Sequence, residues 1–157
     1  MILTTHALTG AVIGKNISNP WIIIPVSLAI HYLMDSIKHA EYFDSRVAKI
    51  KDTWWKVAID LAIGFSIIFS FFYLEKSSFI EMRNMLIGIF FSLFPDFITL
   101  LHWKFRENKL LAEIKKLHSW SHRYGKYPKY SPERQWNFKN ATNDIVISLI
   151  AIVFLFI

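Results

Sequence analysis

Long apolar stretches dominate the chain, and five of them are candidates for helices in a membrane. Trp54–Leu74 is interrupted only by Lys56 and Asp60, and Met85–Trp103 contains Asp96 as its one charged residue. Both have the roughly 20-residue length that a helix needs to cross a hydrocarbon core. The three shorter stretches are Pro20 to about Ile37, Ala141–Ile157 and Ile2–Gly14.

The remaining segments differ in pattern. Ile2–Gly14 is too short for a full span, so we expect either a half-span or a helix buried inside the bundle. In Glu107–His122 the apolar residues fall at helical spacing between charged ones, which predicts an amphipathic helix at the membrane interface. Residues 124–139 have no periodicity and predict a loop. The pattern therefore predicts one all-α domain over residues 1–157, a polytopic bundle of four to five apolar segments plus a cytoplasmic interfacial helix.

Composition supports the membrane class. The chain is 54% hydrophobic and 19% charged, whereas charged residues make up about a quarter of a soluble domain. There is no cysteine, which excludes a disulfide framework, a thiolate metal site and a cysteine nucleophile.

Positive charge is concentrated in two loops. Residues 104–139 hold ten Lys or Arg against three Glu, and Lys38, Arg46, Lys49 and Lys51 follow the second apolar stretch. By the positive-inside rule, both loops and the N-terminus are cytoplasmic in a five-span chain. Anionic lipid is the expected partner of the basic segment, and no nucleic acid is expected. The oligomeric state stays open.

Ionisable residues inside apolar stretches are costly and by default mark function. In the oriented chain, His6, His31, Asp35, Asp96 and the remaining histidines all fall near the cytoplasmic depth. The outer halves of the stretches contain almost nothing ionisable. This distribution predicts one shared site.

Spacing gives that site a chemistry. His31 and Asp35 are four residues apart, as are His118 and His122, so each pair projects from one helix face. Joined by a bridging carboxylate such as Asp96, and with His6 nearby, these pairs provide ligands for one or more divalent metals. Imidazole and carboxylate ligands suit zinc first, and also accept manganese or iron.

Each candidate also has a structural interpretation. His31 and Asp35 could bond only each other, and Asp60 could pair with Lys56. His118 and His122 could be ordinary interfacial residues. We expect His39, near the membrane exit, to be solvated or to orient a ligand, and Asp144 to be a helix-dipole partner. His102, on another helix face than Asp96, is a weaker ligand candidate.

Several motifs resemble the membrane-bound metal-dependent hydrolases, small inner-membrane proteins of the YdjM-like type. They are Thr5-His6-Ala7-Leu8-Thr9-Gly10, His31-Tyr-Leu-Met-Asp35 and Phe94-Pro95-Asp96, with His118-Ser-Trp-Ser-His122 standing in for the double-histidine motif of that family. The pattern is also distantly similar to zinc-dependent phospholipase C. The resemblance implies a metal-dependent hydrolase acting on a phosphoester, in a prokaryotic-type inner membrane.

The leading hypothesis is therefore a membrane hydrolase with a metal site near the cytoplasmic interface, acting on a phosphoester in a lipid or other amphiphile. The expected metal ligands are His6, His31, Asp35, Asp96, His118 and His122. Asp35, Asp60 and Arg123 form the expected catalytic set, in which Asp60 is a metal ligand or orients one and Arg123, with Lys126, holds the phosphate. Two rivals remain open: a non-catalytic membrane protein with structural His/Asp pairs, and a metal carrier.

Overall fold

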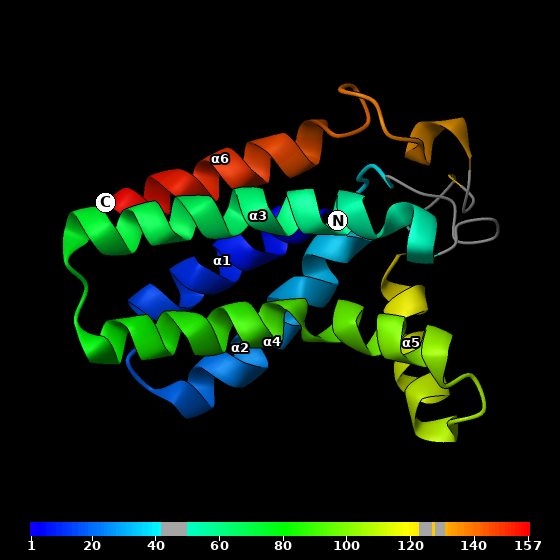
Figure 1. Cartoon of the computed structure of the whole chain (residues 1–157), viewed down its shortest axis with the longest axis horizontal. Helices are drawn as coiled ribbons and strands as arrows, with labels where there is room; N and C mark the ends of the chain where they lie inside the picture. The colour runs from blue at the N-terminus through cyan, green and yellow to red at the C-terminus, as the bar shows by residue number, and fades with distance from the viewer. Residues whose placement is uncertain (42–49, 123–126, 128–130) are drawn as a thin grey trace.

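The computed structural model describes residues 1–41, 50–122, 127 and 131–157, and all the named elements in this part of the chain are helices (Figure 1). The elements in order are α1 (Leu3–Asn16), α2 (Pro20–Ser36), α3 (Ile50–Glu75), α4 (Phe79–Lys104), α5 (Lys109–Ser121), the 3-10 turn η1 (Pro132–Arg134) and α6 (Thr142–Phe156). The all-α prediction is confirmed, and each predicted apolar stretch corresponds to one of these helices.

The helices begin where the sequence supplies capping side chains. Asn19 accepts a hydrogen bond from the Trp21 N–H at the start of α2, where Pro20 takes the first helical position. Ser78 and Asn108 cap α4 and α5 in the same way. Each cap satisfies an N–H that has no partner within its own helix, so the start of these three helices is fixed locally.

α1 runs through the middle of the bundle and contacts α2, α3, α4 and α6 (Figure 1). Its buried residues include Ala7, Leu8 and Ala11, which pack in the core against Ile68 of α3 and Ile89 of α4. Of the two arrangements expected for the first segment, the structure therefore has the helix buried inside the bundle.

The closest helix contact is between α1 and α4, and it depends on glycine. A Cβ atom on Gly10 would lie 2.5 Å from the backbone oxygen of Gly88, and one on Gly14 would collide with the backbone of Asn84. Small residues four apart are typical of helices that pack closely in membranes. This backbone approach places the start of α1 against the middle of α4, beside the candidate site.

Two helices of the described chain, α3 and α4, are long and apolar enough to cross a membrane. The expectation of four to five spans is wrong for the structure, because α1, α2 and α6 have 14, 17 and 15 residues and fall short of the required length. The apolar windows of α3 and α4 are only 17% and 33% buried. The core helix of a soluble protein would be mostly buried instead, so these faces indicate membrane association.

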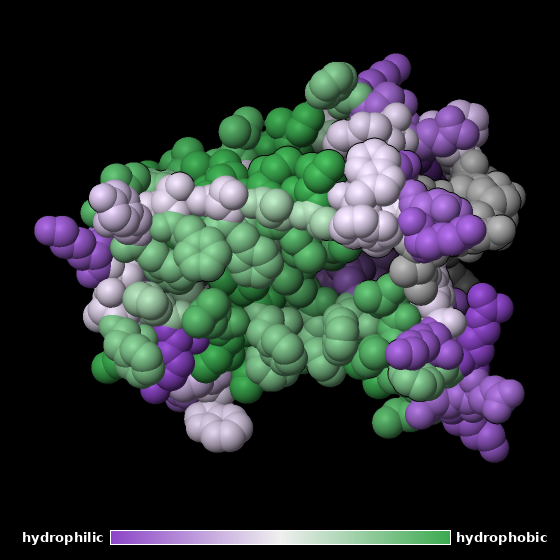
Figure 2. Space-filling view, viewed as in Figure 1, coloured by the Kyte–Doolittle hydropathy of each residue, from purple (hydrophilic) through white to green (hydrophobic). Residues whose placement is uncertain are grey.

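The surface agrees with that interpretation. Apolar side chains form a broad belt over the bundle, and hydrophilic side chains gather at the end that carries α5 (Figure 2). The belt includes large exposed residues such as Ile63 and Phe69 of α3 and Leu149 of α6. An apolar surface of this extent needs a partner or a lipid environment.

Candidate metal centre

The six residues predicted as metal ligands lie together at the end of the bundle where α1 begins and α2 ends. Four helices contribute them: His6 from α1, His31 and Asp35 from α2, Asp96 from α4, and His118 and His122 from the end of α5. We call this group the His–Asp centre. It is assembled from segments more than 110 residues apart in the sequence, and the side chains of His6, His31 and Asp35 have no exposed surface.

Asp35 is the middle of the centre. Its Oδ2 atom lies 3.0 Å from Nε2 of His31, 2.9 Å from Nε2 of His118 and 3.2 Å from Nε2 of His122. Three imidazole nitrogens thus converge on a single carboxylate oxygen. The two nitrogens from α5 are themselves only 3.0 Å apart.

The other carboxylate oxygens extend the cluster toward α1 and α4. Asp35 Oδ1 accepts a hydrogen bond from the Met1 amino group at 2.8 Å and lies 3.2 Å from His6 Nε2. Asp96 lies 3.5 Å from His118 Nε2 through Oδ1 and 4.0 Å from His6 Nε2 through Oδ2. Asp96 Oδ2 is buried without a hydrogen-bond partner in the described part of the chain, so it is an anionic oxygen that lacks a donor.

The hydrogen bonds of the Nδ1 atoms of His31 and His118 determine which ring nitrogen of each histidine has the free lone pair. His31 Nδ1 lies 2.7 Å from the Ser92 carbonyl oxygen, which can only accept, so this nitrogen carries the proton. The Thr99 hydroxyl donates to the Pro95 carbonyl, so its oxygen accepts from His118 Nδ1 at 2.7 Å. In the neutral rings, Nε2 of both histidines is therefore the unprotonated nitrogen and faces Asp35 and its neighbours.

α4 supplies the groups that orient two histidines of the centre. The Ser92 carbonyl accepts from His31, and the Pro95 carbonyl accepts from the Thr99 hydroxyl that positions His118. Asp96 and both orienting groups thus lie within two turns of one helix.

Three overlapping groups in the centre could hold a metal ion, and each consists of two histidines and one aspartate. They are His6–His31–Asp96, His31–Asp35–His118 and Asp35–His39–His122. The second group has Nε2–Nε2 and Nε2–Oδ2 separations of 3.4, 3.0 and 2.9 Å. A tetrahedral ion with bonds of 2.0–2.1 Å sets its ligands about 3.3 Å apart. The group therefore resembles one face of such a tetrahedron and leaves a fourth position for water or substrate.

His39 belongs to the centre, contrary to the expectation of a solvated residue near the membrane exit. It is buried in the loop after α2, its Nδ1 donates to the Ile37 carbonyl at 2.8 Å, and its ring lies 5.1 Å from that of His122. Burial holds the pKa of His39 well below its ordinary value and also lowers the pKa of His122. Both rings are therefore kept neutral, the form that binds metals.

The structure places Asp60 outside the centre. Its carboxylate accepts hydrogen bonds from the backbone N–H groups of Leu3 and Thr4 at 2.7 and 3.1 Å. These are among the first N–H groups of α1, which have no partner in their own helix. Asp60 thus caps α1 from α3, a role that differs from the expected catalytic one and from a pair with Lys56.

Asp144 has a similar structural role at the start of α6. It is buried and accepts from the backbone N–H groups of Ile2 and Ala40 at 3.0 and 3.2 Å. It therefore ties the ends of three segments together beside the centre. His102 is in none of the three metal-binding groups. Arg123 and Lys126, expected to hold phosphate, lie outside the described residues.

Arg134 is a residue of the site that no sequence motif singled out. It is buried, donates to the His122 backbone oxygen at 3.0 Å and forms an ion pair of 2.9 Å with Glu41. The Glu41 N–H in turn donates to the Arg134 carbonyl at 2.7 Å. Arg134 thereby joins the end of α5 to the segment that follows His39, and holds two histidines of the centre in place.

Comparison of the chain with protein-family models, with curated proteins and with solved structures gives no match.

Proposed function

We propose that the chain is a metal-dependent hydrolase that cleaves phosphoesters at a membrane, with zinc as the leading metal and manganese or iron as substitutes. The observation that carries the proposal is the convergence of three imidazole Nε2 atoms on Asp35 Oδ2, two of them with lone pairs directed at the same point. The buried Asp96 Oδ2 without a donor supports it. Both features favour a bound cation.

The donor set fits a hydrolytic metal. Sites with two histidines and one carboxylate hold catalytic zinc in peptidases and iron in oxygenases. His31, Asp35 and His118 would hold one ion, and His6 with Asp96, or His39 with His122, would hold a second. When bound, such a metal lowers the pKa of water and stabilises charge on a phosphoryl oxygen.

The protein's own groups have distinct parts in the reaction. Ser92 and Thr99 fix the two orienting protons at Nδ1 of His31 and His118, so both Nε2 atoms stay available. In the hydrolysis, water adds its oxygen to phosphorus, the ester P–O bond breaks, and the departing oxygen takes up a proton. The products are an alcohol and a phosphate. Basic residues of the 104–139 segment, Arg123 and Lys126 among them, are proposed to bind the substrate's phosphate.

The proposal includes an orientation. α5 and the basic segment lie at the same end of the bundle as the centre, and the positive-inside rule puts that end on the cytoplasmic side of an inner membrane. Anionic lipid headgroups would then surround the basic segment. A topology reporter inserted in the loop that follows α5 would test directly on which side of the membrane this end of the bundle lies.

Metal content is the first test. The protein is purified in detergent without a histidine tag and measured by elemental analysis. We expect at least one zinc, manganese or iron per chain, loss of metal in His31→Ala and in Asp35→Ala, and full retention in His102→Ala, a histidine of α4 outside the centre. Metal retained in both ligand variants would contradict the proposed site.

Activity is the second test. The metal-loaded protein is assayed with a soluble phosphate diester and a monoester, with the metal-free Asp35→Ala protein as the blank. Release of the alcohol by the loaded wild type alone supports the hydrolase. Bound metal without hydrolysis of any phosphoester would overturn it and favour the carrier. No metal at all would favour structural His/Asp pairs.

A further inference from the structure

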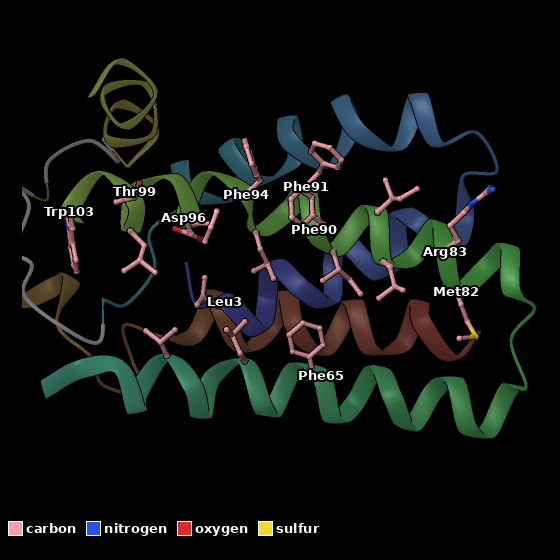
Figure 3. A pocket seen from close by; sticks show the side chains of 18 of the residues that line it. Leu3, Phe65, Met82, Arg83, Phe90, Phe91, Phe94, Asp96, Thr99 and Trp103 are labelled. Atoms are coloured by element: carbon pink, nitrogen blue, oxygen red, sulfur yellow. The ribbon is translucent and has the colours of Figure 1, made fainter. Parts of the chain in front are cut away.

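A long apolar groove lies between α3 and α4, and the His–Asp centre is at one end of it. Its volume is about 910 Å³, near the upper end for ligand pockets. Figure 3 shows it from close by, with Trp103, Thr99 and Asp96 toward one end and Arg83 and Met82 at the other. Between these ends the lining is almost entirely aliphatic or aromatic.

The groove is straight and runs along the helices. Its wall on α4 includes Leu86, Phe90, Leu93 and Phe97, which recur every three or four residues and so form one stripe. On α3 the wall is formed by Val57, Leu61 and Phe65, again four residues apart. From Asp96 to Phe79 the stripe covers 17 residue steps, or about 25 Å at the helical rise. A long apolar groove fits an alkyl chain better than a compact ligand.

Asp96 and Thr99 join the groove to the centre. Both line the groove, Asp96 is also in the His6–His31–Asp96 group, and Thr99 binds His118. The side chain of Asp96 is 28% exposed, whereas those of His6, His31 and Asp35 have no exposed surface. Figure 2 looks onto α3 and α4 and shows hydrophilic side chains set back beside apolar ones, toward the end that carries α5. Asp96 is therefore the ligand of the centre that lines the groove.

We propose that this groove binds the acyl chain of a bilayer lipid whose phosphoester headgroup meets the centre at Asp96. The inference rests on the proposed function, and it adds the substrate class and the route of entry. The two walls are the helices that can cross a membrane, so the groove faces lipid and a chain enters sideways without leaving the apolar phase. The reacting phosphate is anionic and meets the end of the groove where the metal ligands gather, which gives the substrate its direction.

Two blocking variants test the groove. Leu61→Trp fills its α3 wall, and Leu86→Trp, at an exposed position of the α4 wall, is a second block in case the first fails to fold. The matched control is Ile63→Trp, which is on the outward face of α3 and does not line the groove. Metal content is measured for each variant to show that the centre is intact.

The first readout is hydrolysis of two phosphate esters with the same headgroup, one with a 16-carbon chain and one with a 4-carbon chain. We expect the blocked variants to lose the long-chain activity at least tenfold while keeping the short-chain activity, and the control to keep both. Equal long-chain activity in the blocked variants and the wild type would overturn the inference.

The second readout does not depend on catalysis. A 16-carbon alkyl phosphate with a diazirine in mid-chain is photolysed with the protein in detergent, and the labelled peptides are identified by mass spectrometry. We expect labels on peptides that contain Leu61 and Phe90, and their loss in the blocked variants. Labels spread over the outer faces of α3 and α6 would refute binding of the acyl chain in the groove. Absence of label because a helix of a second copy or of another protein fills the groove would refute it as well. Labelling of the groove without hydrolysis of either ester would uphold chain binding and overturn the hydrolase.

Discussion

Replacement of Asp35 by asparagine tests the centre most directly. The side chains have nearly the same shape, but the amide replaces one carboxylate oxygen with an NH2 group and removes the negative charge. Asp35 is in two of the three metal-binding groups, and its oxygens lie within 3.2 Å of four histidine nitrogens. We therefore expect Asp35→Asn to lose its metal while the surrounding helices keep their arrangement.

The size of the effect follows from linkage. A ligand at 1,000 times its dissociation constant stabilises the folded state by about 4 kcal/mol. For a domain of about this size, 1 kcal/mol corresponds to roughly 2–4 °C in Tm. Zinc should therefore raise the Tm of the chelator-treated wild type by about 8–16 °C. In the metal-free form, the variant also loses the buried ion pair between Asp35 and the Met1 amino group, which costs about 3–5 kcal/mol, so it starts from a lower Tm.

The assay is thermal unfolding in detergent, followed by the fluorescence of the six tryptophans, with EDTA and after addition of zinc. The control is His102→Asn, which changes a histidine outside the centre and should respond to zinc like the wild type. An equal zinc shift in Asp35→Asn and the wild type would refute the assignment of Asp35 as a ligand. If neither zinc nor EDTA changed the Tm of the wild type, the metal centre as a whole would be refuted.

Three further predictions concern the groups around the centre. Thr99→Val removes the acceptor for His118 Nδ1 and should weaken metal binding about 10–100-fold in a chelator competition, whereas Thr99→Ser should not. Arg134→Met should lower the free energy of unfolding by about 3 kcal/mol, measured in urea, because it breaks the buried ion pair next to His122. Gly88→Ala should lower the Tm because its Cβ would meet the α1 backbone, and Gly64→Ala, whose Cβ lies 3.2 Å from the nearest atom, should lower it less.

Helix positions were predictable because long apolar stretches and amphipathic spacing are local signals. The number of membrane spans was not, since the same hydropathy describes a helix that crosses a bilayer and a short one buried among others. In Ile2–Gly14 the glycines distinguish a short buried helix from a membrane span. The four-residue spacing of Gly10 and Gly14 permits the close contact with α4 that buries α1. Length and small residues together therefore describe this helix better than hydropathy.

The grouping of the candidate ligands also followed from local signals. Pairs four residues apart share a helix face, and a common depth in the membrane brings such pairs to one level. The roles of Asp60 and Arg134 could be seen only in the tertiary structure. The partners of Asp60 are 56 and 57 residues away in the sequence, and Arg134 pairs with the distant Glu41. His39 lies in the loop after α2, so its four-residue interval from Asp35 is not a helical spacing and did not predict its place in the centre.

Proton positions give the strongest argument that the centre is more than a set of structural pairs. His31 and His118 each use Nδ1–H on an acceptor outside the cluster. With neutral rings, two Nε2 lone pairs 3.4 Å apart face each other and the Asp35 carboxylate, and no hydrogen bond joins them. With protonated rings, two imidazolium cations are in contact in a buried site, and His122 Nε2 is 3.0 Å from one of them. Each of these two arrangements is costly. A divalent cation held by His31, Asp35 and His118 gives the two lone pairs and Asp35 Oδ2 one shared partner, which is why zinc should raise the Tm of this protein.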